Sequence, residues 1–212
     1  MRVRALRALH KLSLIAHTPG ALNQTVRVHQ LVQRATRDTL ASGQHHQLAR
    51  TAADAVLIAW PAIERDSELA QALRANTTAL TTCAEDAPYR PDTHVVLYHS
   101  GSSLGEAGQV TAATRYFQHL AATSSRNLSP HHPNTLTARD YLTHWRGRTG
   151  DAAGAATAFA ELLADQLRVL GHAPLHPHHP RQPGLLARRG WRRCRRSNRL
   201  GTTAVRPAAS VR

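Results

Sequence analysis

Apolar residues recur at helical spacing along much of the chain, and the clearest pattern runs from His131 to Gly171. A break at 147–150 divides it into two helical stretches. The first predicts a helix over about 134–146, and the second predicts a helix that starts at Asp151, a good N-cap, and is closed by Gly171. One apolar stripe follows the second helix; it comprises Ala152, Ala155, Ala156, Phe159, Leu162, Leu163, Gln166, Leu167 and Leu170.

The same pattern occurs 42 residues upstream without gaps. The shift pairs Pro91 with Pro133, Gly105 with Gly147, Gly108 with Gly150, Ala113 with Ala155, Phe117 with Phe159, and Leu120 with Leu162. A helix pair that recurs at a fixed period is typical of a stacked array, because one pair cannot bury its stripe alone. We therefore predict a mainly α protein with a helical-hairpin solenoid, whose repeats lie at about 89–123 and 133–170.

The N-terminal segment has a different pattern. Residues 2–12 predict a short helix, residues 13–17 and 25–29 predict two strands of a small β-hairpin, and residues 30–41 predict another helix. Residues 44–60 and 62–82 predict a further helix pair that connects this segment to the array.

Two resemblances fit these patterns. The stretch HPNTLTARDYLTHWRGRTGDAAGAATAFAELLADQLRVLG resembles the kinesin-light-chain type of tetratricopeptide repeat, as found in actinobacterial proteins. The run LSLIAHTPGALNQTVRVHQLVQRATRD resembles the winged-helix segment of STAND-type (NB-ARC) signalling ATPases. Together they imply a winged-helix remnant at 1–43, a connecting helix pair at 44–84 and two tetratricopeptide repeats at 85–175. The alternative for the first segment is a small helical cap of the array.

In such ATPases a nucleotide-binding domain with a phosphate-binding loop precedes the winged helix. No segment of this chain fits the spacing G-x-x-x-x-G-K-[ST], and no glycines precede Lys11, the one lysine. We therefore expect a truncated relative that lacks the nucleotide-binding domain and does not hydrolyse nucleotides.

The net charge of +14 is concentrated near the C-terminus, since residues 181–212 contain ten arginines and no acidic residue. One interpretation of residues 176–212 is a basic, disordered tail that binds nucleic acid. The other is a frameshifted repeat, because plausible codons from Arg181 onward, read one base later, give DNLAYWRGEAGDAAGAAT, which aligns with residues 140–157. We favour the frameshift, and the nucleotide sequence decides it.

No residue pattern indicates catalysis, so we predict no enzyme, no cofactor and no metal site. The histidine cluster of His172, His176, His178 and His179 has no carboxylate or cysteine at a fixed offset. The acidic pair Glu161 and Asp165 is expected on a solvated helix face, and no serine has a G-x-S-x-G context.

The two cysteines lie in unrelated contexts, which argues against a disulfide framework. No signal peptide is convincing, and no apolar run approaches the length that spans a membrane. These observations predict a cytoplasmic protein without membrane contact.

What remains is a docking surface. In a helix-pair solenoid the first helix of each repeat lines the concave face, which binds peptides or partner helices. The predicted partner-binding stripe consists of Thr137, Asp140, Tyr141 and His144 in the second repeat with Tyr98 and His99 in the first, next to Val95 and Ser102. Ala138, Leu142 and Trp145 are expected to pack inward.

The sequence therefore predicts a protein–protein interaction scaffold that binds a peptide or a partner helix. The alternative is nucleic-acid binding through the winged-helix remnant and the Arg-rich tail, although we do not expect nucleic acid as the principal partner. Self-association is also expected, because the apolar stripe of the last helix is left uncovered at residue 171.

Overall fold

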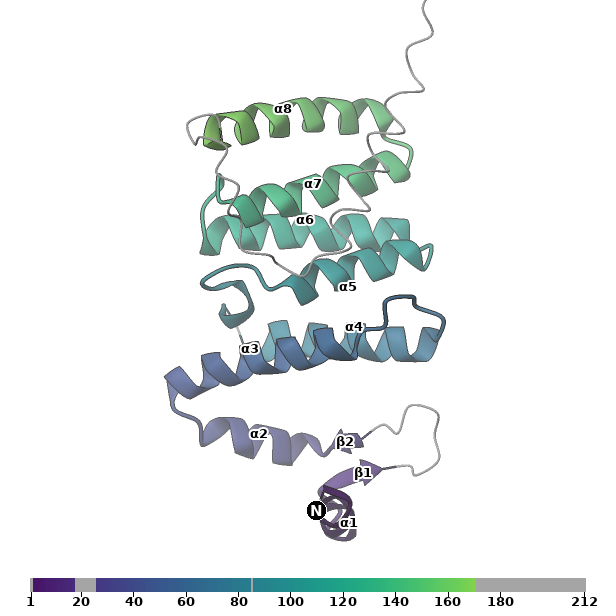
Figure 1. Cartoon of the computed structure of the whole chain (residues 1–212), viewed down its shortest axis with the longest axis vertical. Helices are drawn as coiled ribbons and strands as arrows, with labels where there is room; N and C mark the ends of the chain where they lie inside the picture. Colours follow the sequence, from purple (N-terminus) through teal and green to yellow (C-terminus); the bar gives the residue numbers. More distant parts are fainter. Residues whose placement is uncertain (1, 18–25, 85, 171–212) are drawn as a thin grey trace, which may run out of the picture. The chain divides into compact units, whose positions relative to one another are not determined.

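Helices dominate the computed structural model, which describes residues 2–17, 26–84 and 86–170 (Figure 1). Along the chain the elements are α1 (Arg2–Lys11), β1 (Ile15–His17), β2 (Val26–Val28), α2 (Gln30–Asp38), α3 (Ser42–Ala59), α4 (Ser67–Cys83), η1 (Ala87–Tyr89), α5 (Val95–Glu106), α6 (Val110–Asn127), α7 (Pro133–Arg148) and α8 (Ala152–Leu170). The prediction of a mainly α protein is confirmed. Each helix in the described part of the chain is too short or too polar to cross a bilayer.

The N-terminal elements form where the sequence predicts them. β1 and β2 pair antiparallel, with Ile15 opposite Val28 and His17 opposite Val26. The strands are shorter than predicted. α2 starts at Gln30, as predicted, and none of its side chains is buried.

The connecting helix pair is also present, as α3 and α4. α3 ends at Ala59, just before Trp60 and a proline, as expected. α4 begins at Ser67 rather than at 62, because the Asp66 carboxylate accepts hydrogen bonds from the backbone N–H groups of Glu68 and Leu69. Ile63, which falls within the stretch predicted as this helix, lies in the connecting loop and is 65% exposed.

The 42-residue register is retained in three dimensions. The α5–α6 turn contains Gly108 at φ 82° and the α7–α8 turn contains Gly150 at φ 99°, a left-handed conformation that suits glycine. The helices after these turns bury equivalent residues, since Leu120 is 3% and Leu162 2% exposed. The pairs differ at their start: α5 begins at Val95, four residues later than the α7 start predicts by the register.

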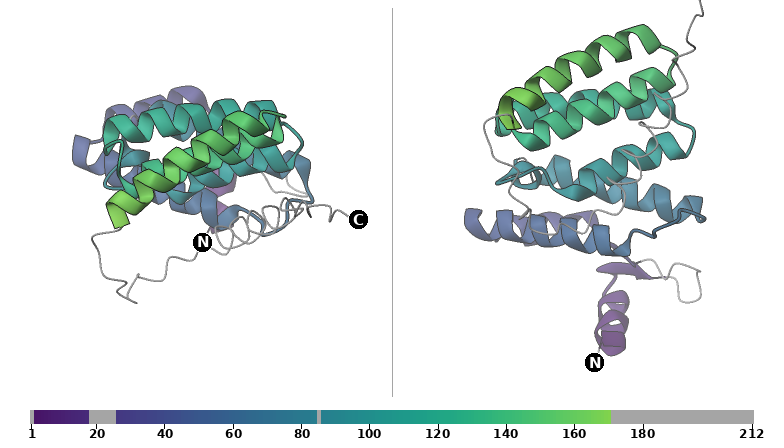
Figure 2. Two further views of the ribbon diagram at one scale, coloured as in Figure 1. Left: turned by 90° about the horizontal axis from the view of Figure 1, so that it is seen from above. Right: turned by 45° about the horizontal axis from the view of Figure 1, so that its top comes forward.

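Successive helices from α3 to α8 pack against one another (Figures 1 and 2), and one core extends from α3 to α7. Its most buried large side chains include Leu97 of α5, Phe117 of α6 and Trp145 of α7. The inward positions predicted for α7 are confirmed, because Ala138 is fully buried and Leu142 packs on this core beside Trp145. The core therefore crosses the boundary between the two predicted repeats.

Three expectations concern residues outside the described ranges. They are the closing role of Gly171, the histidine cluster at 172–179 and the nature of the basic segment at 176–212. They stay predictions.

Candidate functional site

The predicted partner-binding stripe lies on α5 and α7, the first helices of the two pairs. Along α7 the four positions are i, i+3, i+4 and i+7, which places them on one face. Thr137 is exposed, and its hydroxyl donates a hydrogen bond to the Pro133 carbonyl at 2.9 Å. Asp140, Tyr141 and His144 are half-buried. The α7 part of the stripe is therefore accessible.

Tyr98, which the sequence places in this stripe, is buried and so adds little accessible surface to it. Its side chain is 8% exposed because α7 packs over it. The Tyr98 hydroxyl donates to the backbone carbonyl of Asn134 at 2.8 Å, and its ring centroid lies 5.7 Å from that of Tyr141. Tyr98 thus connects α5 to α7, whereas His99, the other predicted binding residue of α5, is half-exposed.

Tyr141 has a structural contact as well as an accessible edge. Its ring stacks on Phe117 with a centroid distance of 4.8 Å and an interplanar angle of 8°. Burial, followed by the nearby carboxylates of Asp140 and Glu106, raises the pKa of the Tyr141 phenol. The phenol therefore stays protonated at neutral pH and can act as a hydrogen-bond donor to a partner.

The charge of the Asp140 carboxylate is not balanced by an ion pair on this face. Burial raises the pKa of its carboxyl above the ordinary value. The ion pairs formed within the described residues do not include Asp140. A partly desolvated carboxylate favours a cationic or hydrogen-bond-donating ligand, because such a group replaces the water lost on burial.

His99 lies at the α3 end of the same face. Its ring centroid is 6.0 Å from that of Trp60. Burial lowers the pKa of His99, and the Glu64 carboxylate opposes that effect. At neutral pH His99 is therefore uncharged and can both donate and accept hydrogen bonds.

A polar network beneath His99 holds α3, α4 and α5 together. The carboxylate of Glu64 accepts hydrogen bonds from the Trp60 indole at 2.6 Å and from the Ser103 hydroxyl at 2.8 Å. Arg74 of α4 donates to the Ser103 oxygen at 2.6 Å. Its charge lies 3.9 Å from Glu64, and both side chains are largely buried. This network fixes the floor of the face and leaves His99 accessible.

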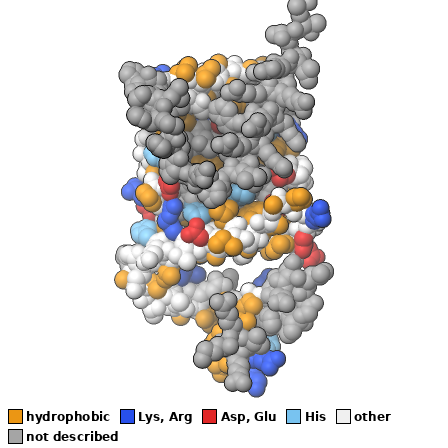
Figure 3. Space-filling view, viewed as in Figure 1, with side chains coloured by type: hydrophobic (Ala, Val, Ile, Leu, Met, Phe, Trp, Pro, Cys, Tyr) orange, Lys and Arg blue, Asp and Glu red, His pale blue; other side chains and the backbone are white. Residues whose placement is uncertain are grey.

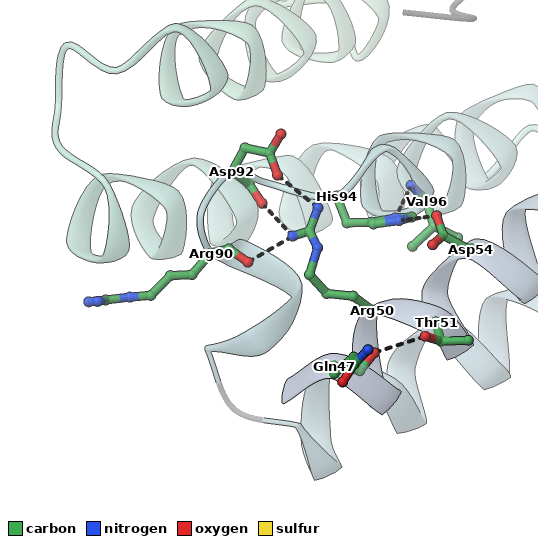
Figure 4. Close-up of polar contacts among 8 residues, drawn as sticks. All are labelled: Gln47, Arg50, Thr51, Asp54, Arg90, Asp92, His94 and Val96. Atoms are coloured by element: carbon green, nitrogen blue, oxygen red, sulfur yellow. Dashed lines mark hydrogen bonds and ion pairs between the residues drawn. The ribbon is translucent and has the colours of Figure 1, made fainter. Parts of the chain in front are cut away.

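A second set of polar contacts joins α3 to the segment before α5 (Figure 4). The Arg50 guanidinium donates to the backbone carbonyl of Arg90 at 2.8 Å and to the side chain of Asp92 at 2.8 Å. His94 Nε2 lies 3.0 Å from an Asp54 carboxylate oxygen, while His94 Nδ1 accepts from the N–H of Val96 at 3.2 Å. Since Nδ1 is an acceptor, the proton of the neutral ring lies on Nε2 and is donated to Asp54.

Histidine caps three helices in the same way. His29, His94 and His132 each have extended backbone at φ near −64° and accept, through the side chain, from the N–H two residues later. Capping side chains of this kind satisfy an otherwise unpaired N–H at the helix start. His132 is thus a structural residue of α7.

Several charges on the described surface are paired. On the face viewed in Figure 3, basic and acidic side chains lie next to one another. Arg50 pairs with Asp92, and Arg90 pairs with Asp86. Asp165 of α8 pairs with Arg139, and the hydrogen bond from Arg139 lowers the pKa of its carboxyl. Asp165 is therefore an ion-pair partner rather than one half of an acid–base pair.

The described residues support neither a metal site nor a ligand pocket on the stripe. Within residues 2–17, 26–84 and 86–170, no three His, Cys, Asp or Glu side chains are grouped so as to hold a metal ion. A depression of about 540 Å³ between α2 and α4 is lined by Gln30, Leu31, Gln33, Arg34, Arg37, Ala75, Thr78, Ala79, Thr82 and Cys83, and it is open and away from the stripe.

The polar networks were not expected from the sequence. Arg50 and Asp92 are 42 residues apart, and Arg74 and Ser103 are 29 apart, so local periodicity does not connect them. The sequence does contain a signal for the capping histidines, because His29, His94 and His132 each directly precede a predicted or observed helix start.

Comparison with known proteins adds no partner: no family model, no curated protein and no solved structure matches the chain.

Proposed function

We propose that this chain is a protein-interaction scaffold built from tetratricopeptide-like helix pairs, and that α5 and α7 bind an extended peptide or a partner helix. The observation that carries the proposal is the Asp140 carboxylate, which is half-buried and outside the ion pairs of the described residues, beside the accessible Tyr141 and His144.

The chemistry of this face specifies its ligand. His99, Tyr141 and Thr137 offer uncharged donors and acceptors, which suit the amides of a peptide backbone. Asp140 offers a negative charge in a partly desolvated place, which suits one Arg or Lys side chain. The proposed ligand is therefore a peptide with a basic residue that pairs with Asp140.

The test is selection from a displayed random peptide library against the immobilised full chain, followed by fluorescence anisotropy with a selected peptide. Asp140→Asn and His144→Ala should each weaken binding about tenfold, which is 1.4 kcal/mol. His119→Ala is the matched control, since His119 is an exposed histidine on α6, away from the stripe. If no selected peptide depends on Asp140 or His144, the proposal fails.

The full chain also serves to test the alternative of nucleic-acid binding, which the ten arginines of residues 181–212 favour. Binding to a labelled DNA duplex through this segment should fall steeply with added salt and vanish when residues 181–212 are removed. Peptide binding on α5 and α7 should survive that deletion. Salt-sensitive duplex binding without any selected peptide would favour the alternative.

A further inference from the structure

The depression between α2 and α4, which we call the α2–α4 groove, has one basic wall and one wall of small side chains (Figure 1). The basic wall belongs to α2, whose groove-lining polar residues recur at i, i+3, i+4 and i+7 and so share one helix face: Gln30, Gln33, Arg34 and Arg37. α4 contributes alanine, threonine and a cysteine, and no acidic side chain lines the groove. Its volume of about 540 Å³ is in the range of ligand-binding clefts.

Arg37 is a half-buried cation without a counter-charge. Its side chain takes part in none of the ion pairs or hydrogen bonds formed within the described residues. Arg34 lies 3.7 Å from Asp38, but both side chains are mostly exposed, and such a pair contributes little. A partly desolvated guanidinium favours a carboxylate or phosphate, because charge-assisted hydrogen bonds replace the water lost on burial. The basic wall therefore favours an anionic ligand.

The charge of the N-terminal segment acts in the same direction. Residues 1–43 contain seven Lys and Arg side chains and one acidic residue, Asp38. Residues 44–180 contain ten Lys and Arg side chains and twelve acidic ones, so the helix array has a slight negative charge. A local excess of one sign attracts ligands of the other and speeds their association. The N-terminal segment, which supplies the basic wall, thus attracts an anionic partner more strongly than the array does.

The groove also has an apolar part, which narrows the class of ligand. Leu31 of α2 lines it and is 71% exposed, and Ala75 and Ala79 of α4 are exposed opposite polar residues of α2. A nucleic-acid backbone offers phosphates but no aliphatic side chain, and the flat surface of a bilayer does not enter a groove. An acidic peptide offers carboxylates, aliphatic side chains and backbone amides, and the amides suit the side chains of Gln30 and Gln33.

We propose that the α2–α4 groove binds an acidic peptide segment of another protein, with a carboxylate paired to Arg37 and an aliphatic side chain beside Leu31. This site is separate from the stripe on α5 and α7, and it selects the opposite charge. The scaffold therefore has a second interaction, whose ligand differs in chemistry from the basic peptide proposed for Asp140.

The probe is a labelled peptide that repeats Glu-Glu-Leu three times, and its binding to the full chain is measured by fluorescence anisotropy. Arg37→Gln should weaken binding about tenfold, because it removes the unpaired charge of the groove. Arg115→Gln is the matched control, since Arg115 is exposed on α6 and also outside the ion pairs of the described residues. It removes the same charge and should leave the affinity unchanged, which separates the groove from attraction to the ten arginines of residues 181–212.

A second pair of variants tests the groove without a change of charge. Thr78→Leu adds bulk to the α4 wall and should weaken binding about tenfold. Thr157→Leu is its control, since both threonines are exposed on helices and donate a hydrogen bond to the carbonyl four residues earlier. A probe in which serine replaces each leucine should bind about tenfold more weakly to the unchanged chain, because it leaves Leu31 without an apolar partner.

Circular dichroism and thermal unfolding verify that the four variants remain folded. Absence of binding to the unchanged chain overturns the proposal, as does equal affinity for Arg37→Gln and Arg115→Gln or for the leucine and serine probes. A labelled DNA duplex that loses affinity with Arg37→Gln but not with Arg115→Gln, while the peptide does not, would assign the groove to nucleic acid and likewise overturn it.

Discussion

The α5–α6 and α7–α8 pairs follow one register but differ in their surroundings. α5–α6 is packed between the α3–α4 pair and α7, whereas α7–α8 has helical neighbours on one side only within the described residues. Residues of the same type at the same register therefore differ in burial, as Phe117 and Phe159 do. In a stacked helix-pair protein the neighbour, more than the sequence pattern of the pair, decides which side chains form core.

The largest difference between the pairs should appear on removal of these two rings. Phe117→Ala should destabilise the fold by about 3–5 kcal/mol, because it empties a fully buried site and removes the stack on Tyr141. Phe159→Ala should cost about 1 kcal/mol, since its ring is half-solvated in the native state. Urea unfolding followed by circular dichroism measures both. Equal losses would show that the far side of α8 is covered.

Substitution of the equivalent glycines, Gly105 and Gly147, should change the stability of the fold by smaller amounts and in opposite directions. Gly105→Ala should destabilise by about 2 kcal/mol, because the added methyl displaces the Trp145 indole. Gly147→Ala should stabilise by up to about 1 kcal/mol, since alanine favours the helix and has room there. Thermal unfolding distinguishes the two shifts. A loss at Gly147 similar to that at Gly105 would contradict the comparison.

The capping histidines of α5 and α7 should also differ. His94→Leu removes the cap of α5 and the hydrogen bond to Asp54 from a buried site, at a cost of about 1–2 kcal/mol. His132→Leu removes only a half-buried cap and should cost about 0.5–1 kcal/mol. His94→Asn keeps a capping oxygen and should recover part of the loss, measured by urea unfolding. A loss in His94→Asn as large as that in His94→Leu would exclude capping as the cause.

The smallest predicted stability effect has a pH dependence. The folded-state pKa of Asp140 is raised, so its ionised form is disfavoured by the fold and its contribution to stability falls as pH rises through that pKa. Asp140→Asn should therefore stabilise the fold by about 0.5 kcal/mol at neutral pH while weakening peptide binding. Below the ordinary pKa of 3.8 the gain should disappear. Urea midpoints at neutral and acid pH measure it, and a loss of stability at neutral pH would contradict it.

Local periodicity was sufficient to predict the elements. Helix-period stripes, the glycine breaks and the Asp151 N-cap located α3 to α8 within a few residues, except for the starts of α4 and α5. The side of α5 that meets α7 was not predictable in this way. Tyr98 sits at a position that the spacing assigns to the open face, and its burial depends on the Asn134 carbonyl, 36 residues later.

The candidate site likewise has one part that the sequence predicts and another that it does not. The accessible half of the stripe, at Thr137, Asp140 and His144, follows from helical spacing along α7. The contacts that shape its floor join Glu64, Arg74 and Ser103 from three elements. Such pairings depend on how the helices stack, which a single sequence without internal contact information does not specify.

Native-state hydrogen exchange tests the difference between the pairs most directly. Amides in the middle of α6, around Ala121, should exchange only on global unfolding, because α5 and α7 cover that helix. Amides around Leu163 of α8 should exchange through local opening, at least about tenfold faster, because that helix is more exposed. Equal protection of α6 and α8 in the free chain would contradict the account.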